Sequence, residues 1–361
     1  MSPQVELTYR IVTLLKGLII AKKKEIQTYL ENTRQMATGK IVSAEIGEIY
    51  KHKGYGGTTY IIKGELTTVN CGVIPGGIVI KFTNDLSDET KNATLLHDIL
   101  NQRQQEWDEA RKNGFKLPPA MKHFPDRLYA PGVLGTISQE GTNVLMLELV
   151  DDPISVSDCF IQEDFMELLL LIGYALARLH GFREFKPVSR TAYEPLMKHL
   201  ESFTDPTTLG KWKDIIFNSQ AGVPYIHGDS HLMNLLRSGE NLAWIDAMLI
   251  PDSDRLDDVG YALSFLVQKE VKRAIDAGTP PVDVIRKFIT ICAREWIPQV
   301  LNGYSAIVDI RSIYQSIPID FFLGAHCIVR AGLWTDQQMV YVLKEIGKYF
   351  IEHAPFLMSL Q

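Results

Sequence analysis

The stretch that decides the fold is residues 227–234, which read HGDSHLMN, together with residues 244–246, which read WID. Asp229, Asn234 and Asp246 follow one another on a predicted loop between apolar segments. Their carboxylate and amide oxygens are the donors that a hard divalent cation such as Mg²⁺ prefers. A lone loop aspartate usually caps a turn. Three oxygen-bearing side chains in this order instead favour a site that combines a cation with an acid–base group.

The order and spacing of these side chains match the groups that transfer phosphate from ATP in protein kinases. There, a loop Asp accepts the hydroxyl proton, an Asn holds one Mg²⁺ and a later Asp holds the other. The interval from Asp229 to Asn234 equals that of the kinase catalytic loop. The pattern therefore predicts Asp229 as the catalytic base, and Asn234 and Asp246 as ligands of Mg²⁺.

The chain resembles the family of aminoglycoside phosphotransferases and choline kinase-like proteins, which are small-molecule kinases with a protein-kinase-like fold. That family writes its catalytic loop as HGDxxxxN and its metal aspartate in an Ile-Asp pair, and both forms occur here. Residues 254–259 read DRLDDV, similar to the family's Asp-Arg-x-x-Asp-Ile stretch. The resemblance implies that Asp258 braces the loop and that His227 packs beneath it. It is strongest over residues 225–265 and extends to residues 45–185.

The expected fold class is α+β, with a small antiparallel β-rich lobe followed by a larger helical lobe. Alternating apolar residues and glycine-containing turns predict strands in the first part, and apolar residues at helical spacing predict helices after it. The strands are expected over residues 41–47, 58–62, 77–82 and 144–150, and the helices over 89–113, over 163–180 and from Leu256 onward. The predicted domains are a helical extension over 1–40, a nucleotide-binding lobe over 41–150 and a catalytic lobe over 151–361.

Lys81 is the candidate for contacting the α- and β-phosphates of the nucleotide. It ends a predicted strand in the run Val-Ile-Lys, which is similar to the kinase Val-Ala-Ile-Lys strand. Its ion-pair partner should be a glutamate on the next helix. Glu106 is the preferred residue and Glu109 is the competitor. Both lie far from Lys81 in the sequence, which implies an insertion after the strand.

Gly54, Gly56 and Gly57 lie between two predicted strands. Glycine lets backbone N–H groups approach a phosphate closely, so these residues are candidates for a phosphate-binding loop. A hairpin turn is the alternative interpretation.

The segment from Met146 through Glu148 to Leu149 is expected to connect the two lobes. Its backbone would hydrogen-bond the adenine edge, and Met146 would line the pocket. An ordinary core strand is the alternative, because only backbone groups are needed for this role.

The composition is that of a globular protein, with 361 residues, 46% hydrophobic and 22% charged. The net charge of −6 argues against a nucleic-acid-binding surface. No segment approaches the roughly 18 apolar residues of a membrane helix, and the expected location is cytoplasmic. The four scattered cysteines are expected to be buried free thiols. A predicted amphipathic helix over residues 4–35 either packs on its own domain, the preferred interpretation, or contacts a partner in a homodimer.

The function predicted from these residues is an ATP- and Mg²⁺-dependent transfer of phosphate to a hydroxyl of a small molecule. The first alternative is a catalytically silent module that keeps the kinase fold to bind nucleotide or to regulate. The second is a zinc hydrolase that uses His227, Asp229 and His231, and the third is a protein-serine kinase. Intact Lys81, Asp229, Asn234 and Asp246 count against the first, and the absence of DFG and Ala-Pro-Glu segments counts against the third.

The acceptor and the preference for ATP or GTP are left open by the sequence. Asp254, Asp257 and Glu201 would suit a cationic acceptor such as an aminoglycoside or a choline-like amine. A sugar, an amino alcohol, a macrolide and a protein side chain are equally compatible with the motifs.

Overall fold

The computed structural model describes residues 41–53, 58–68, 72–122, 124–139, 142–150, 154–156, 165–181, 185–313 and 318–353. The chain divides into two compact units, Met1–Asp98 with Ala130–Pro153, and Ile99–Tyr129 with Ile154–Gln361. Residues 99–129 thus belong to the second unit, although the sequence prediction counted them with residues 41–150. The helix expected over 4–35 and the three glycines at 54–57 lie outside the described residues.

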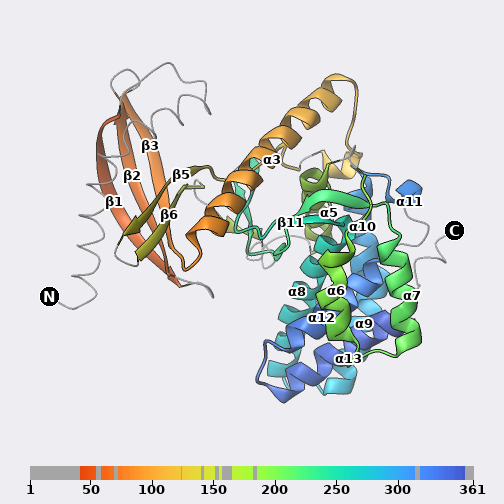
Figure 1. Ribbon diagram of the computed structural model, residues 1–361. Helices are drawn as coiled ribbons and strands as arrows, with labels where there is room; N and C mark the ends of the chain where they lie inside the picture. The colour runs from red at the N-terminus through yellow and green to blue at the C-terminus, as the bar shows by residue number, and fades with distance from the viewer. Residues whose placement is uncertain are drawn as a thin grey trace. The chain divides into compact units, whose positions relative to one another are not determined.

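The first unit contains an antiparallel five-stranded sheet (Figure 1). Its strands are rich in β-branched and aromatic residues, which suit a pleated surface. In spatial order they are β1 (Ile41–Lys53), β2 (Thr58–Thr68), β3 (Gly72–Phe82), β6 (Thr142–Glu148) and β5 (Val133–Gln139). The predicted β-rich first part is confirmed. Strands β1, β2 and β3 are longer than predicted, β6 begins and ends two residues before its predicted bounds, and β5 was not predicted.

Helix α3 (Leu86–Lys112) begins in the first unit and continues into the second. Acidic residues lie in its first turn and basic residues in its last, which complements the helix dipole. It buries Leu96, Leu100 and Trp107, which recur at helical spacing. Within the second unit, the Trp107 ring meets the ring of Tyr174 edge-on, with centroids 6.0 Å apart.

Two small sheets lie in the second unit. One has the strand order β4 (Arg127–Tyr129), β10 (Asn241–Trp244), β9 (Leu235–Ser238) and β7 (Ile154–Ser155). The other pairs β11 (Ile250–Asp254) with β8 (Gly222–Ile226) in antiparallel register. Because β8 precedes residues 227–234 and β9 follows them, both ends of that segment are fixed by strand pairing.

The rest of the second unit is helical, as predicted, with α12 packed against both α8 and α13, and α10 packed against α5 (Figure 1). The predictions of a helix near 163–180 and of one starting near Leu256 are confirmed by α5 and α8. The helices are α5 (Phe165–His180), α6 (Arg190–Leu200), α7 (Pro206–Phe217), α8 (Arg255–Asp276), α9 (Pro281–Ile291), α10 (Ile297–Ser305), α11 (Ile310–Ile313), α12 (Ile319–Ala331) and α13 (Gln337–His353). A short 3₁₀ turn, η1 (Pro119–Met121), and a π-helical turn, η2 (Cys292–Trp296), complete the described elements.

Two observations bear on the composition. Cys292 and Cys327 are buried free thiols, as expected for the cysteines that the structure describes. Within the described ranges, no helix combines the length and the apolar character that crossing a membrane requires.

Helices α5 and α10 cross with their backbones in direct contact. A Cβ atom added to Gly173 would lie 2.0 Å from the carbonyl oxygen of Val300. A Cβ atom added to Gly303 would lie 2.1 Å from the carbonyl oxygen of Leu170. These obstacles are main-chain atoms of packed helices, so a side-chain rotation cannot relieve the clash. The crossing therefore requires glycine on both helices.

We predict that Gly303→Ala lowers the free energy of unfolding by about 3 kcal/mol, the upper part of the range for overpacked cores. Gly210→Ala is the matched control, because a Cβ atom on this helical glycine of α7 would meet no atom within 4 Å. Alanine at that position should raise stability by about 0.5–1 kcal/mol through its higher helix propensity. Urea denaturation of both variants measures the difference, and equal effects of the two substitutions would disprove the close crossing.

Candidate functional site

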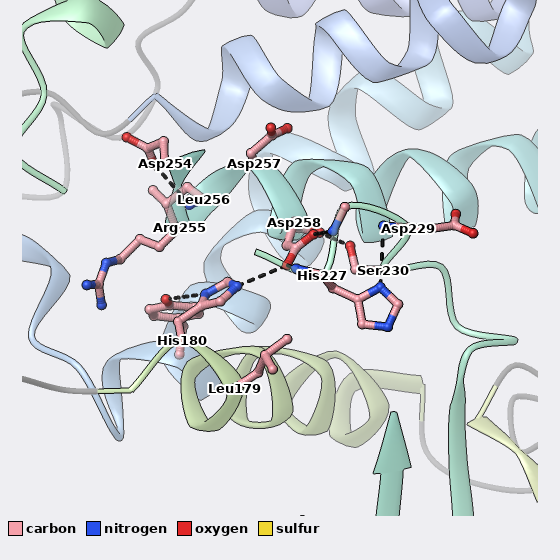
Figure 2. A network of polar contacts seen from close by, with 12 residues as sticks. Leu179, His180, His227, Asp229, Ser230, Asp254, Arg255, Leu256, Asp257 and Asp258 are labelled. Carbon is pink, nitrogen blue, oxygen red and sulfur yellow. Dashed lines mark hydrogen bonds and ion pairs between the residues drawn. The ribbon is translucent and has the colours of Figure 1, made fainter. Parts of the chain in front are cut away.

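The segment His227–Asn234, called the 227–234 loop below, lies between β8 and β9 of the second unit. Beyond the ends of these strands, its backbone groups need partners outside the ladders. The side chain of Asp258, in the first turn of α8, supplies two of them (Figure 2). Its Oδ2 accepts from the N–H of His227 at 2.7 Å, and its Oδ1 accepts from the N–H of Gly228 at 3.0 Å.

A third contact ties the loop to the same residue. The Oγ of Ser230 donates to the backbone oxygen of Asp258 at 2.8 Å (Figure 2). Asp258 is 1% exposed. Burial works to raise the pKa of Asp258, but its contacts with His180 and with the backbone N–H of His227 outweigh it, and the pKa lies below its ordinary value. Asp258 therefore holds the loop as a charged carboxylate, the arrangement that a brace of this loop requires.

His180, the last residue of α5, completes the arrangement around Asp258. Its Nε2 lies 3.0 Å from Oδ2 of Asp258, and its Nδ1 lies 2.8 Å from the hydroxyl oxygen of Tyr304. Burial lowers the pKa of His180. In the neutral ring, Nε2 would carry the hydrogen and donate to the carboxylate, while Nδ1 would accept from Tyr304.

The loop needs glycine where it turns. Gly228 has a φ of +76°, in the left-handed region that side chains rarely adopt. An added Cβ atom would also lie 2.9 Å from Cγ1 of Ile250 on the neighbouring strand β11.

The ring of His227 lies beneath the loop and joins it to residues 245–249. Its Nε2 is 3.0 Å from the backbone oxygen of Ile245, and its Nδ1 accepts from the N–H of Asp229 at 3.3 Å. The carbonyl of His227 accepts from the N–H of Met248 at 2.9 Å. Burial lowers the pKa of His227, which suits a neutral ring with one donor and one acceptor nitrogen. These contacts are those of a structural support.

The carboxylate of Asp229 meets three side chains of the second unit. Its Oδ1 accepts from the hydroxyl of Tyr261 at 2.7 Å, and its Oδ2 accepts from Nδ2 of Asn234 at 3.2 Å. Nδ2 of Asn234 also donates to the backbone oxygen of Asp229 at 2.9 Å. The ring of His231 places Nε2 at 3.6 Å from Oδ2, and burial lowers the pKa of that ring. The Asp229 side chain is 26% exposed, so it is oriented but accessible.

Asp246 lies next to this group. The N–H of Ile245 donates to the backbone oxygen of Asn234 at 2.9 Å, which places the segments that carry Asn234 and Asp246 side by side. Asp246 is exposed and has a φ of 55°, an uncommon conformation for a residue with a side chain. Its negative charge also works to raise the pKa of His231.

Asn234 and Asp246 carry amide and carboxylate oxygens, the kind of donor that Mg²⁺ prefers. With Nδ2 of Asn234 donating to Asp229, its Oδ1 is the amide atom suited to a cation. In the described part of the chain, no group of three or more His, Cys, Asp or Glu side chains is placed to hold a metal. Mg²⁺ often takes only one or two protein ligands and completes its shell with water and phosphate. The zinc hydrolase considered as an alternative requires a cluster of this kind around His227 and His231, and the described residues do not provide it.

Lys81, on β3 of the first unit, has a different partner from the one predicted. Its Nζ lies 3.0 Å from Oε2 of Glu89. Glu106 instead accepts from Nη1 of Arg103 at 3.0 Å, so the prediction of Glu106 is wrong. The reason is the start of α3 at Leu86, directly after β3, which brings a first-turn glutamate within reach of Lys81. No insertion separates strand and helix, and Glu109 lies farther along α3 than Glu106.

The strand predicted to contact adenine is β6. Its backbone at Met146 pairs with Ile80 of β3. Oε2 of Glu148 accepts from the N–H of Gly132 at 3.1 Å, and Leu149 follows the end of the strand. Strand β6 is an inner strand of the sheet, between β3 and β5. The contact of these residues with adenine stays a prediction, as does the phosphate role of Gly54, Gly56 and Gly57.

Sequence reasoning missed two side chains of this site, His180 and Tyr261. Tyr261 lies one turn after Asp258 on α8, so the two share a helix face, which is a usable signal. His180 ends an apolar helix and offers no pattern that would have marked it.

No family model matches the chain, and no curated protein matches it. Among solved structures, amicoumacin kinase in complex with AMP-PNP and Ca²⁺ is 14% identical, over 85% of this chain and 89% of that one, with a TM-score of 0.40. A choline/ethanolamine kinase family protein from Mesorhizobium loti is 12% identical, over 90% and 99%, with a TM-score of 0.36. The kinase domain of Mycobacterium tuberculosis PknI is 12% identical, over 81% and 98%, with a TM-score of 0.31. Likenesses this distant carry no argument about function.

We predict that Asp258→Ala destabilises the protein by about 3 kcal/mol or more, because it leaves two loop N–H groups and His180 without their acceptor. Asp257→Ala is the matched control in the same helical turn. The carboxylate of Asp257 meets Nε2 of His326 at 2.5 Å, and its loss should cost about 1–2 kcal/mol. Chemical denaturation compares the two. A cost at Asp258 no larger than that at Asp257 would contradict the bracing role.

Proposed function

We propose that the protein is an ATP- and Mg²⁺-dependent phosphotransferase that moves the γ-phosphate to a hydroxyl of a small molecule, with Asp229 as the base. One observation carries this proposal. The carboxylate of Asp229 is oriented by Tyr261 and Asn234, on a loop anchored to buried Asp258, and it lies beside the segment of Asp246. A carboxylate that is fixed, accessible and adjacent to oxygen donors suits the deprotonation of a hydroxyl next to a metal-bound phosphate.

In the proposed reaction, Asp229 orients the acceptor hydroxyl and takes its proton. The acceptor oxygen forms a bond to the γ-phosphorus while the bond from that phosphorus to the β–γ bridging oxygen breaks, and ADP leaves with that electron pair. Oδ2 of Asp229 is the favoured proton acceptor, because its contacts are longer than the 2.7 Å bond that Tyr261 makes to Oδ1. The fixed position of the carboxylate lowers the entropic cost of reaching the reactive geometry.

Asn234 and Asp246 are proposed to hold the metal through Oδ1 and a carboxylate oxygen. When bound, Mg²⁺ would neutralise charge on the phosphate groups. The left-handed backbone at Asp246 supports this role, because a conformation that costs about 1–3 kcal/mol is typically kept at functional positions.

For the nucleotide, we propose that Lys81 contacts the α- and β-phosphates and that Glu89 orients its ammonium group. The 3.0 Å ion pair between them supports this assignment. The backbone of residues 146–149 and the glycines at 54–57 remain the candidates for the adenine and phosphate contacts.

The acidic residues that the sequence suggested for a cationic acceptor do not identify the acceptor. Asp254 caps α8 by accepting from the N–H of Leu256 at 2.9 Å. Asp257 pairs with His326, and Glu201 pairs with Lys213 at 3.2 Å. Since each of these acids already has a partner, they give no reason to prefer a cationic acceptor.

We predict that Asp229→Ala lowers kcat by about 10²–10⁴-fold, the usual contribution of a positioned base, and leaves nucleotide binding largely intact. ATP consumption with a panel of alcohols measures turnover, and a nucleotide-induced shift in melting temperature measures binding. Exposed Glu240 lies in the turn between β9 and β10, and Glu240→Ala is the control carboxylate. Turnover by the Asp229 variant comparable to wild type would refute the base. A wild-type protein that binds ATP but never consumes it would support the silent module instead.

We predict that Asp246→Asn weakens the binding of ATP in the presence of Mg²⁺ by at least about 10-fold, which corresponds to 1.4 kcal/mol. Asparagine tolerates the left-handed backbone, so the substitution removes charge without adding strain. The stabilisation by ATP should depend on Mg²⁺ in the wild type and lose most of that dependence in the variant. An unchanged affinity with Mg²⁺ present would exclude Asp246 as a ligand.

A further inference from the structure

Tyr261 makes the shortest side-chain contact to Asp229, a donated hydrogen bond of 2.7 Å to Oδ1. We propose that Tyr261 is a positioning residue that fixes the carboxylate of Asp229 for proton abstraction, and that Arg330 holds the ring of Tyr261 in place. This inference rests on the proposed function, because it concerns the geometry of the same base.

The position of Tyr261 on α8 supports this role. Asp258, one turn earlier on the helix, fixes the backbone of the loop, and Tyr261 fixes the side chain that projects from it. Both anchors belong to one helix, whose residues Val259, Ala262 and Leu263 are fully buried. The backbone of the 227–234 loop and the carboxylate of Asp229 are therefore both anchored to the same rigid helix. This limits the rotation of the Asp229 side chain relative to its own loop.

The ring of Tyr261 is itself held from α12. The guanidinium carbon of Arg330 lies 4.3 Å from the ring centroid, and the ring of His326 meets it edge-on at 5.0 Å. Arg330 is anchored back to α8, because its Nε donates to Oγ of Ser264 at 2.7 Å and its Nη1 to Gln268 at 3.2 Å. A tyrosine enclosed in this way loses little further entropy on donating its hydrogen bond.

Arg330 also acts electrostatically. It is 5% exposed, and its hydrogen-bond partners are neutral. Its Nη2 has no hydrogen-bond partner among the described residues. Burial lowers the pKa of Arg330, while the charge of Asp229 works to raise it. Buried cations need a compensating charge. The negative charge of Asp229 is one of those that compensate the buried guanidinium.

The cation against the Tyr261 ring further strengthens the bond to Asp229. Electron density drawn toward a guanidinium on the ring face leaves the phenol O–H more polarised, and a charge-assisted hydrogen bond gains from that. Oδ1 of Asp229 thus accepts the hydrogen bond from Tyr261, and Oδ2 is left to take the proton of the acceptor hydroxyl. A buried tyrosine that merely satisfied its hydroxyl would affect stability, whereas a positioning residue affects the rate of the chemical step.

The test is Tyr261→Phe, which removes the hydroxyl and keeps the ring that contacts Arg330 and His326. We expect kcat to fall by about 10- to 100-fold, with the KM for Mg·ATP within about twofold of wild type, because the lost contact orients the base and not the nucleotide. Tyr341→Phe is the matched control, since this tyrosine of α13 is 48% exposed. An active enzyme whose kcat is unchanged by Tyr261→Phe, or whose loss appears only in KM, would overturn the inference.

A second measurement separates this inference from the proposed function. In protein labelled with ¹³C at the tyrosine ring carbon that bears the hydroxyl, the signal missing from Tyr261→Phe identifies Tyr261. The chemical shift of that signal should change in Asp229→Asn. An unchanged chemical shift would disprove the contact between Tyr261 and Asp229, whether or not the enzyme turns over. If the signal shifts but the wild type consumes no ATP with any alcohol, the proposed function fails and the positioning role fails with it, while the hydrogen bond stands.

The role of Arg330 is tested by substitutions that remove or keep its positive charge. Arg330→Gln should lower kcat in the same direction as Tyr261→Phe, and Arg330→Lys should restore part of it, because lysine keeps the cation next to the ring. A double variant of Tyr261→Phe and Arg330→Gln should lose less than the product of the two single effects. Fully independent effects would show that Arg330 does not act through Tyr261.

Discussion

The second unit depends on one buried carboxylate, that of Asp258. The N–H groups of His227 and Gly228 lie just beyond the end of β8, where strand pairing no longer satisfies them. Asp258 accepts from both, and it also meets the ring of His180. The dependence is mutual, because a charge excluded from water is tolerated only with donors of this kind. The loop is consequently attached to a helix whose apolar face lies in the core.

Burial falls step by step from this anchor toward the groups proposed for chemistry. Asp258 is 1% exposed, the Asp229 side chain is 26% exposed, and Asp246 is exposed. A reacting group must meet its ligand, whereas its supports hold their geometry best when water cannot compete for their hydrogen bonds. The arrangement satisfies both demands by letting a buried residue, Asp258, fix the backbone on which an accessible residue, Asp229, is carried.

Much of this could be predicted because the deciding patterns are local. Strand composition, the apolar run of α5 and the spacing around Asp229 each depend on a few neighbouring residues. The partner of Lys81 was mispredicted because a glutamate in the middle of the helix predicted over residues 89–113 was preferred to Glu89, the first residue of that helix. The signal was present, since Asp85 accepts from the N–H of Asp88 at 3.1 Å, as a residue capping a helix would. Tyr261 carried only a weaker signal, its position one turn after Asp258, because tyrosine in an amphipathic helix is most simply interpreted as a core residue.

The first turns of α8 explain why a loop with little regular structure can be positioned accurately. Asp254 caps the helix, Asp258 holds the loop backbone and Tyr261 holds the carboxylate of Asp229. Any tilt of α8 would move all three contacts together, so their relative geometry survives small displacements. Because α12 packs against α8 through Arg330, substitutions there can reach the site without touching it. The accuracy with which the 227–234 loop is positioned is thus set by the packing of the helices. Packed core helices are the most protected part of a folded unit.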